Sequence, residues 1–408
     1  MPESPQAGLR DRLSKLDPSD ASYASEFVDC LFELAVAAGA SDLHLLPTDE
    51  ALDVRWRIDG VLTAVGVFPR SIAANVAGRL KVLADLLTYR TDIPQEGRIR
   101  SPKAGVEMRL STLPTLYGEK AVIRLFITGG RYLRLAELGL PADITSEVAR
   151  LLGETGGAFL ITGPAGSGKT TTAYACLREI LERSAGGRSV VTLEDPIEQV
   201  IAGAAQSQVN QEGEFSMAAG LKFLMRQDPE VILLGEIRDP STAETAFQAA
   251  LTGHLVISTF HTGSAAGALS RLADMGIAPY LLRSGLLGIL SQRLVRRLCD
   301  CAVTDNRDDA HLGLAVTTAR RPVGCPACQE TGYRGRLVLA EMLRVEQSDL
   351  GRAILSRGDS ARLEALAIEG GMISRWQRAI QAIEAGLTSP AEVRRTLGFS
   401  DNSGGGLL

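Results

Sequence analysis

The stretch from residue 159 to residue 172 restricts the possible folds of this chain more than any other. It reads FLITGPAGSGKTTT, an apolar run followed by a glycine-rich turn and the start of a helical pattern. The apolar run Phe159–Ile161 predicts a buried strand. In the turn, Gly163 is followed after four residues by Gly168-Lys169-Thr170. This spacing predicts a phosphate-binding loop between a strand and a helix.

The chemistry of phosphate explains the residue types in this loop. Glycines allow backbone N–H groups to converge on phosphate oxygens, and the N-terminus of the next helix adds positive potential. Lys169 can reach the β- and γ-phosphates of a nucleotide, and the hydroxyl of Thr170 can bind Mg²⁺. An ordinary strand–turn–helix corner does not require all eight positions of the pattern, so we expect a nucleotide site. Its predicted loop contacts are Gly163, Pro164, Ala165, Gly166, Ser167, Gly168, Lys169, Thr170 and Thr171.

The balance of charge argues against one class of function. The 408 residues include 43 Lys and Arg and 48 Asp and Glu, which gives a net charge of −5. We therefore expect no nucleic acid partner held mainly through its phosphate backbone. No apolar run approaches the roughly 20 residues of a membrane span, and the first residues lack the apolar core of a signal peptide. We expect a cytoplasmic protein of about two or three domains, whose contact with a membrane is peripheral.

Hydrophobic periodicity divides the chain into segments. Residues 1–21 are polar and predict a flexible lead-in, and residues 22–130 mix helix and strand patterns, which predicts an α+β domain. Residues 131–156 predict a linker and a helix. Strand and helix signals alternate over residues 157–345, which predicts a parallel sheet with helices on both faces. Residues 346–408 predict helices and a disordered tail.

Individual elements follow from the same patterns. In the first domain we expect helices over 22–38 and 71–90 and strands within 41–68 and 97–127. In the sheet domain we expect strands at 158–162, 189–193, 231–235 and 255–259, with helices near 170–183, 217–226, 241–251 and 264–273. A long apolar helix is expected over 279–298, then a strand at 336–343 and helices from 347 to 397.

Carboxylates follow two of the predicted strands. Glu194 stands at the end of the first, where it can orient an attacking water or act as a general base, or else cap a turn. Glu236 stands just past Val231–Leu234. It either lies near Mg²⁺ and the γ-phosphate of a nucleotide or forms a surface ion pair with Arg238.

Two histidines flank the strand predicted at 255–259. His254 precedes it and His261 follows it, so His261 can sense the γ-phosphate. A single histidine is more often structural than catalytic, and this alternative applies to both.

Four cysteines form two close pairs, Cys299-Asp-Cys301 and Cys325-Pro-Ala-Cys328. The second pair has the spacing of a zinc knuckle, and the first can supply the remaining two ligands of a tetrahedral site. In a cytosolic protein such pairs favour a metal over a disulfide. The alternative is two unrelated thiol pairs.

Three arginines, Arg98, Arg109 and Arg124, recur along the predicted strands of the first domain. Arginines at a sheet edge are usually solvated. Beside a nucleotide they can instead neutralise the charge of the γ-phosphate.

Taken together, these motifs resemble the secretion ATPases of the type II secretion and type IV pilus assembly family. The resemblance covers roughly residues 25–395. It rests on SDLHLLP at 41–47, VRWRIDG at 54–60, PQEGRIR at 94–100, RLSTLPTLYGEKAVIRL at 109–125, GPAGSGKTTT, LEDPIE, RQDPEVILLGEIRD at 226–239, TGHLVISTFHT, SQRLVRRLC at 291–299 and CPACQETGYRGR at 325–336.

The resemblance implies a fold and a function. The fold is α/β, a RecA-like P-loop NTPase core preceded by a smaller α+β domain, with a zinc-binding insertion at 299–328 and C-terminal helices. The function is ATP hydrolysis in a ring-shaped homohexamer, with each site between the two domains. Hydrolysis would drive an inner-membrane platform protein that assembles a secretion pseudopilus or a pilus. The implied cofactors are ATP, Mg²⁺ and structural Zn²⁺.

The resemblance also implies a role for each motif residue. Lys169 and Thr170 serve the phosphate loop, Glu194 belongs to the Asp box, and Glu236 to the Walker B motif, where it helps Thr170 to bind Mg²⁺. His254 and His261 form the His box. Arg109 and Arg124 reach the γ-phosphate, and Arg226 and either Arg334 or Arg336 lie near the site. Cys299, Cys301, Cys325 and Cys328 bind zinc.

Departures from the family pattern and three alternatives accompany this interpretation. Lys222 stands where the family usually has arginine, Leu46 where glutamate is common and Glu96 where aspartate is common. Cys299-Asp-Cys301 is one residue tighter than the family's pair. A pilus retraction ATPase is disfavoured by the cysteines. A nucleic-acid translocase on a RecA-like core is disfavoured by the acidic balance and the lack of aromatic–basic clusters. A nucleotide-binding regulator without hydrolysis is disfavoured by the intact Lys169, Glu194 and Glu236.

Overall fold

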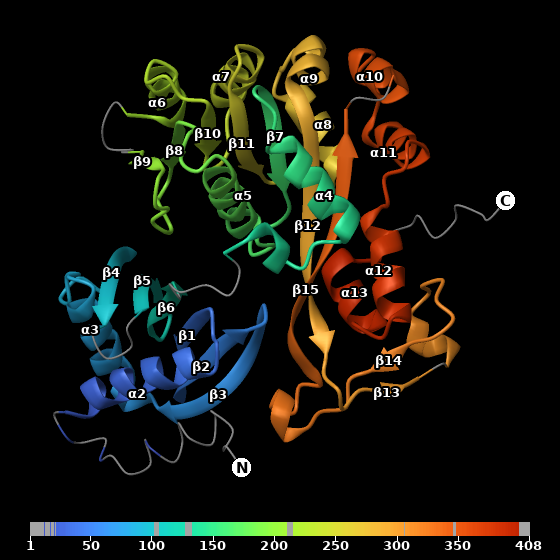
Figure 1. The fold of residues 1–408 in the computed structure, drawn as a ribbon. Helices are drawn as coiled ribbons and strands as arrows, with labels where there is room; N and C mark the ends of the chain where they lie inside the picture. The colour runs from blue at the N-terminus through green and yellow to red at the C-terminus, as the bar shows by residue number, and fades with distance from the viewer. Residues whose placement is uncertain are drawn as a thin grey trace. The chain divides into compact units, whose positions relative to one another are not determined.

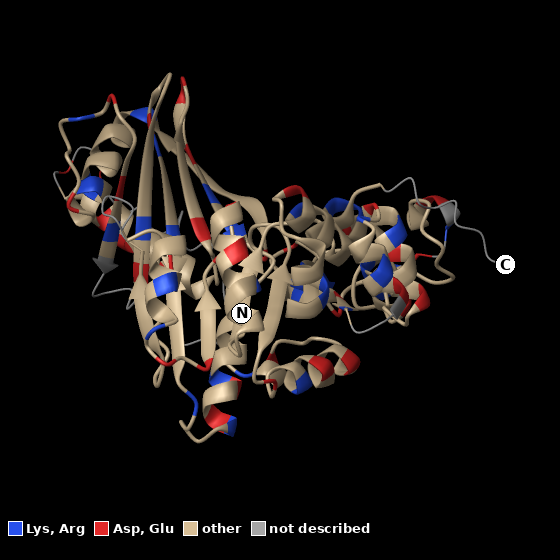
Figure 2. Ribbon diagram, turned by 90° about the horizontal axis from the view of Figure 1, so that it is seen from above, with Lys and Arg blue, Asp and Glu red and all other residues tan. Residues whose placement is uncertain are grey.

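The computed structural model describes residues 12, 17, 20, 22–101, 106–126, 133–209, 215–305, 307–345 and 348–399 (Figure 1). The chain divides into two compact units, residues 1–130 and 131–408, called here the N-terminal and C-terminal units. Residues 131 and 132 of the predicted linker and the predicted tail at 402–408 lie outside the described residues, as does most of the predicted lead-in. Basic and acidic residues are interspersed along the described chain (Figure 2).

The N-terminal unit is a six-stranded antiparallel sheet with two helices packed against it. The strand order is β3-β2-β1-β6-β5-β4. Side chains alternate between a buried and a more exposed face, as in β5, because successive residues of a strand point to opposite sides. The elements are α2 (Tyr23–Ala37), β1 (Asp42–Pro47), β2 (Ala51–Ile58), β3 (Val61–Pro69), α3 (Ala73–Leu83), β4 (Gln95–Ser101), β5 (Val106–Thr115) and β6 (Gly118–Phe126).

Two turns fix the boundaries of these elements. Asp59 and Gly60 have φ angles of 48° and 83°, the left-handed values that a two-residue hairpin between β2 and β3 requires. The helix predicted over 71–90 is wrong at its C-terminal end, because α3 stops at Leu83. Asp85 turns the chain with a φ of 56°, and the carbonyl of Ala84 lies against Gly97 of β4.

The C-terminal unit is built on a seven-stranded sheet of order β15-β12-β7-β11-β10-β8-β9. Its neighbouring strands are parallel except β12 and β15. The strands are β7 (Gly157–Thr162), β8 (Val190–Glu194), β9 (Ala205–Gln208), β10 (Val231–Leu234), β11 (Leu255–Phe260), β12 (Leu286–Leu298) and β15 (Tyr333–Arg344).

Helices cover both faces of this sheet. Phe159 and Ile161 pack in one core with α4 (Ala142–Leu151) and α5 (Lys169–Arg183). Leu160 and Ile232 pack in a second core with α6 (Met217–Leu224), α7 (Pro240–Leu251) and α8 (Ala265–Asp274). The strands of a parallel sheet that is buried on both faces have nearly continuous apolar sequences. The predicted fold class, an α/β core preceded by a smaller α+β part, is confirmed.

The long helix predicted over 279–298 is wrong. Residues Pro279–Gly285 form the short helix α9, and Leu286 then begins the strand β12. An apolar run buried on both faces cannot be told from a buried helix by periodicity alone. Gly288 is the residue in this run that indicates a strand rather than a helix. A Cβ at this position would lie 2.7 Å from Cε of Met342 and 3.1 Å from the carbonyl of Leu343, because β15 passes close by.

The remaining elements are short strands, 3-10 turns and the C-terminal helices. The strands β13 (Val303–Thr304) and β14 (Arg320–Arg321) form a small sheet near the cysteines. The C-terminal helices are α10 (Ser348–Leu355), α11 (Ser360–Glu369), α12 (Arg375–Glu384) and α13 (Pro390–Leu397). Short 3-10 turns occur elsewhere in the two units: η1 (Arg70–Ile72), η2 (Leu135–Glu137), η3 (Asp308–His311) and η4 (Pro326–Cys328). In the described part of the chain no helix combines the length and the apolar character needed to cross a membrane.

The close approach of α3 to β4 gives a stability prediction. A Cβ at Gly97 would lie 2.4 Å from the carbonyl oxygen of Ala84. That oxygen belongs to the backbone and cannot rotate away, so we expect Gly97→Ala to lower the free energy of unfolding by about 1–3 kcal/mol.

Gly78 provides the matched control, because it lies inside α3 and a Cβ there meets no atom within 4 Å. Gly78→Ala should raise stability by about 0.4–1 kcal/mol. Denaturant unfolding of the two variants tests this. Equal stability of the two variants would contradict the packing described for α3 and β4.

Candidate active site

Four parallel strands bring the predicted catalytic residues to one edge of the sheet. β7, β11, β10 and β8 run in the same direction, so their carboxyl ends meet there, which is where ligands bind in open α/β sheets. The phosphate loop follows β7. Glu194 ends β8, Glu236 follows β10 and His261 follows β11. The structure therefore brings these residues together as the sequence suggested.

The phosphate loop has the shape expected of an anion cradle. Gly163 and Gly168 have φ angles of 151° and 89°, and a Cβ at Gly163 would lie 2.5 Å from the carbonyl of Gln292. The helix α5 begins at Lys169, so its free N–H groups and positive end face the loop. Pro164, Ala165 and Gly166 are exposed, while Thr170 and Thr171 open the helix.

The side chain of Lys169 folds back onto the phosphate loop. Its side chain is only 8% exposed, and Nζ donates to the carbonyls of Gly163 and Pro164, each at 3.0 Å. Burial lowers the pKa of Lys169, and the negative charge of Glu236 opposes that shift. The ammonium group is thus within electrostatic reach of Glu236, the carboxylate that is predicted to act on the γ-phosphate.

Gln292 holds the phosphate loop through hydrogen bonds. No sequence pattern predicted this residue as part of the site. It lies on β12 with only 2% of its surface exposed. Its Nε2 donates to the carbonyl of Ser167 at 2.7 Å, and its Oε1 accepts from the hydroxyl of Thr172 at 3.0 Å. Both ends of the loop-to-helix turn are therefore tied to a neighbouring strand.

Glu236 lies between a histidine and an arginine. Its Oε1 is 2.9 Å from Nε2 of His261, and its Oε2 accepts from Nε of Arg238 at 2.8 Å. His261 and Arg238 are largely exposed, with 49% and 62% of their side chains accessible. The predicted ion pair with Arg238 is thus present, but it coexists with the His261 contact at the carboxyl edge.

Glu194 occupies a buried polar cluster. Its side chain accepts hydrogen bonds from Tyr174 of α5, from Thr192 at 2.6 Å and from Gln206 at 3.0 Å. Burial and the bonded carboxylate raise the pKa of Tyr174, so this phenol stays a donor. In this conformation the carboxylate joins α5 to β8 and β9.

Two predicted nucleotide contacts lie at the opposite edge of the sheet. His254 directly precedes β11, and its Nδ1 is 2.9 Å from the carbonyl of Ala249 at the end of α7. Arg226 is exposed in the turn between α6 and β10. Both stand at the amino ends of their strands, so the structure does not bring them together with the phosphate loop.

The arginines predicted from the first domain form a row across the sheet of the N-terminal unit. Arg98, Arg109 and Arg124 stand directly opposite one another on β4, β5 and β6. Arg109 donates to Glu96 at 2.6 Å, and Arg124 donates to Asp42 at 2.9 Å. The guanidinium groups of Arg109 and Arg124 remain largely exposed, at 45% and 66% of their side chains.

The remaining predicted arginines lie on β15. Arg334 and Arg336 are both exposed. They stand on the outer part of the strand, near the cysteines, and Arg336 pairs with Arg296 of β12.

The four clustered cysteines form a donor set that fits zinc. Their sulfur atoms lie within 4.8 Å of one another, and three of the pairs are 3.7, 3.8 and 3.9 Å apart. Four sulfurs at about 2.3 Å from a tetrahedral zinc are spaced by about 3.8 Å, whereas a disulfide brings two sulfurs to about 2.0 Å. The tighter Cys299-Asp-Cys301 spacing does not prevent closure of the set.

Backbone amides favour the charged form of one of these thiols. Burial alone would raise the pKa of Cys328, but the N–H groups of Cys325 and Gly332 donate to its sulfur and hold its pKa at about 7. A thiolate is the form that binds a metal. The pKa of Cys301, in contrast, is raised to about 11, first by burial and further by the neighbouring sulfurs.

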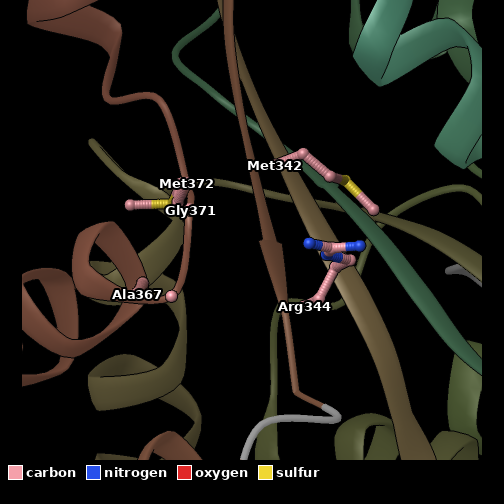
Figure 3. Close-up of a pocket in the computed structure, with 6 residues that line it drawn as sticks. Met342, Arg344, Ala367, Gly371 and Met372 are labelled. Carbon is pink, nitrogen blue, oxygen red and sulfur yellow. The ribbon is translucent and has the colours of Figure 1, made fainter.

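A small cavity away from this edge is no candidate for substrate. It lies between β15 and the segment after α11, is lined by Met342, Arg344, Ala367, Gly370, Gly371 and Met372, and has a volume of about 20 Å³ (Figure 3). A single water needs about 10–15 Å³ on this scale. The cavity therefore admits little more than water.

Comparison with known proteins points to one family. The sequence profile of the family described as "Type II/IV secretion system protein" matches residues 17–395. The chain is 41% identical over 394 residues to the type II secretion system protein E of Pectobacterium carotovorum, covering 95% of this chain and 78% of that one. It is 39% identical over 389 residues to the type II secretion system ATPase E of Vibrio cholerae, covering 93% and 76%.

A solved structure shares the fold. The X-ray structure of the Yersinia pseudotuberculosis ATPase DotB has a TM-score of 0.67 and 20% sequence identity, and the match covers 94% of this chain and 95% of that one. At this identity the similarity bears on the fold alone.

The position of Gln292 gives a prediction for nucleotide binding. Gln292→Leu keeps the size of the side chain but leaves the carbonyl of Ser167 and the hydroxyl of Thr172 without their partner. We expect ATP and ADP affinity to fall about tenfold, since an unsatisfied buried polar group costs about 1–3 kcal/mol. Titration with a fluorescent nucleotide measures the change.

The control is Gln248→Leu on the exposed face of α7. It should leave both affinities unchanged. If the Gln292 variant bound nucleotide as tightly as the control, the loop would not depend on its attachment to β12.

Proposed function

The chain belongs to the type II/IV secretion system family, and from this premise we propose that it is a hexameric ATPase that powers assembly of a type II secretion pseudopilus or a type IV pilus. It acts in the cytoplasm, at the membrane surface, on an inner-membrane platform protein. The observation that carries the proposal is the contact of Glu236 with His261, 2.9 Å apart at the same edge as the phosphate loop. The assembly role rather than retraction is supported by the cysteine cluster.

We assign the phosphates of ATP to the loop and the first turn of α5. Backbone N–H groups of residues 163–171 and the charge of Lys169 hold the β- and γ-phosphates. The hydroxyl of Thr170 and the carboxylate of Glu236 would hold Mg²⁺, which would supply positive charge against the phosphates. Before ATP enters, Lys169 is held by the carbonyls of Gly163 and Pro164, which it exchanges for phosphate oxygens.

Glu236 is the residue that orients the attacking water. His261 and Arg238 fix its carboxylate, one on each oxygen, so it is held in place before the substrate arrives. Glu194 was the other expected candidate, but its carboxylate already accepts from three side chains. We therefore assign Glu194 a positioning role, in which it holds α5 against β8.

The other expected roles remain proposals. Arg109 and Arg124 supply positive charge to the γ-phosphate once they exchange Glu96 and Asp42 for phosphate oxygens, a contribution worth about 10³–10⁵ in rate where it occurs. His254 and Arg226 stay predicted nucleotide contacts, although both lie at the edge of the sheet opposite the phosphate loop. The four cysteines would hold one structural Zn²⁺, which would link the two ends of the segment between β12 and β15.

The role of Glu236 is tested by Glu236→Gln. The amide keeps the size of the side chain but removes the charge that polarises water and binds Mg²⁺. We expect turnover to fall at least about 100-fold while ATP affinity changes only a few-fold. Phosphate release and nucleotide titration on the same sample measure both quantities.

Glu244→Gln is the control, because Glu244 is exposed on α7. Unchanged turnover in the Glu236 variant would remove this residue from the mechanism. ATP binding without turnover in the wild type would instead indicate a regulator, and turnover stimulated by DNA would indicate a translocase.

Zinc content tests the cysteine cluster. Purified protein should contain about one zinc per chain, and Cys301→Ser should lose most of it because three sulfurs no longer close a tetrahedron. Elemental analysis gives the content, and ATP affinity should persist because the cluster lies away from the phosphate loop. Wild-type protein without zinc would refute the assignment, and Cys30→Ser is the control.

A further inference from the structure

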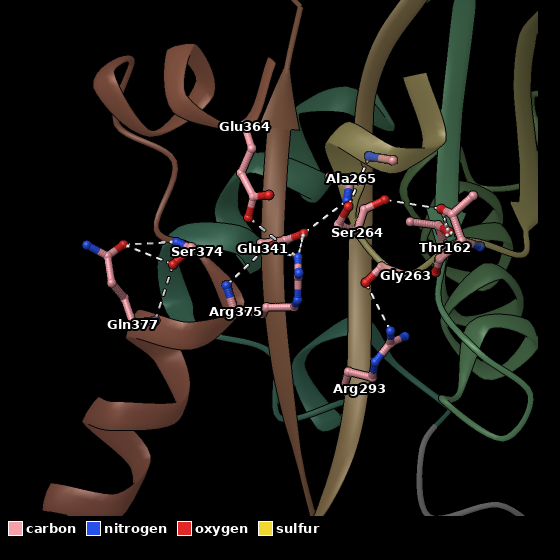
Figure 4. Close-up of polar contacts among 12 residues, drawn as sticks. Thr162, Gly263, Ser264, Ala265, Arg293, Glu341, Glu364, Ser374, Arg375 and Gln377 are labelled. Atoms are coloured by element: carbon pink, nitrogen blue, oxygen red, sulfur yellow. Dashed lines mark hydrogen bonds and ion pairs between the residues drawn. The ribbon is translucent and has the colours of Figure 1, made fainter. Parts of the chain in front are cut away.

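Arg293 has a buried donor without a partner at the edge of the sheet where the phosphate loop begins. It follows Gln292 on β12. Its Nη2 donates to the carbonyl of Gly263 at 2.9 Å (Figure 4), while its Nη1 is buried and makes no hydrogen bond. Buried polar groups in folded proteins are nearly always paired, so an exception calls for an explanation.

The register of the sheet places Arg293 beside the phosphate loop. Ser291 is paired with Thr162, the last residue of β7, so Arg293 lies two residues beyond the point where the loop begins. Gly263 belongs to the segment after β11 that also carries His261. The hydroxyls of Thr162 and Thr262 are 2.6 Å apart and hold this segment against the loop.

The charges around Arg293 leave a place for an anion. Burial lowers the pKa of Arg293, the repulsion of Arg375 adds to this, and the carboxylate of Glu341 opposes it. Arg293 in turn is one of the groups that lower the pKa of Lys169. Within the described residues Arg293 has no carboxylate within 4.0 Å. Lys169 and Arg293 are thus within electrostatic reach of each other, and among the described residues no carboxylate forms an ion pair with Arg293.

We propose that Arg293 binds the γ-phosphate of the ATP held by its own phosphate loop, and that this contact makes the site distinguish ATP from ADP. The inference rests on the proposed ATPase function. A guanidinium presents a fork of N–H donors to phosphate. Nη2 keeps the carbonyl of Gly263 while Nη1 takes a γ-phosphate oxygen. ADP has no γ-phosphate and leaves Nη1 without its partner.

The segment that Arg293 holds is joined to the C-terminal helices. The N–H of Ala265, at the start of α8, donates to Glu341 at 2.9 Å. The N–H of Arg375, at the start of α12, donates to the same carboxylate at 3.0 Å (Figure 4). Glu341 is only 1% exposed. The presence of a γ-phosphate therefore acts on a segment that is bonded through Glu341 to α12.

The test compares two ligands on the full-length hexamer. The affinities of ADP and of a non-hydrolysable ATP analogue are measured with Mg²⁺ for the wild type, for Arg293→Gln and for Arg293→Lys. Arg293→Gln keeps an N–H for Gly263 but removes the charge. We expect it to weaken the analogue at least tenfold and ADP less than threefold. Arg293→Lys should weaken the analogue less, because it keeps the charge.

Arg297→Gln is the matched control, since Arg297 is exposed on the same strand. It should leave both affinities unchanged. An equal loss for both nucleotides in the Arg293 variants would overturn the inference, because Arg293 would then only join β12 to the segment after β11. If Arg293→Gln melts well below the wild type, the loss of affinity for the analogue relative to the loss for ADP is taken from Arg293→Lys instead. A wild type that binds neither nucleotide would refute the proposed function itself.

Discussion

The pairing of β7 with β11 on one side and β12 on the other is the constraint on which the site depends. Each neighbouring strand places polar side chains beside the carboxyl end of β7. β11 leads to His261 and the Thr262 hydroxyl, while β12 supplies Gln292 and Arg293. Because main-chain hydrogen bonds fix this register, the phosphate loop is held in shape before any ligand binds. Nucleotide binding then spends little free energy on ordering the loop.

The sequence predicted the site where local spacing decides the geometry, and failed where distant partners decide it. The loop, Glu236 and His261 follow from strand–turn spacing together with the rule that parallel strands end at one edge. Gln292 could not be found this way, since the carbonyl that it binds is 125 residues away. The side chains that donate hydrogen bonds to Glu194 come from three elements, so its surroundings could not be predicted from local spacing either. The strand β12 was mistaken for a helix because it is buried on both faces.

The row of charges in the N-terminal unit shows how carboxylates orient arginines on one face of a sheet. Asp42 is 5% exposed and contacts both Arg124 and Arg57, at 2.9 and 3.5 Å. One carboxylate thus offsets two guanidinium groups, and Glu96 offsets Arg109. The Arg109–Glu96 pair is exposed on both sides and is therefore weak, whereas the carboxylate of Asp42 is buried. The guanidinium groups of Arg109 and Arg124 are oriented by these carboxylates while they stay largely exposed.

The strands β12 and β15 reach far beyond the sheet that they complete. Ser291 is level with the end of β7, and the strand continues seven residues further to Leu298, paired with β15 along the way. At about 3.3 Å per residue the cysteine cluster stands roughly 23 Å from the phosphate edge. Over this length, a rotation of about 10° at the sheet end of the ribbon would displace the cysteine cluster by roughly 4 Å.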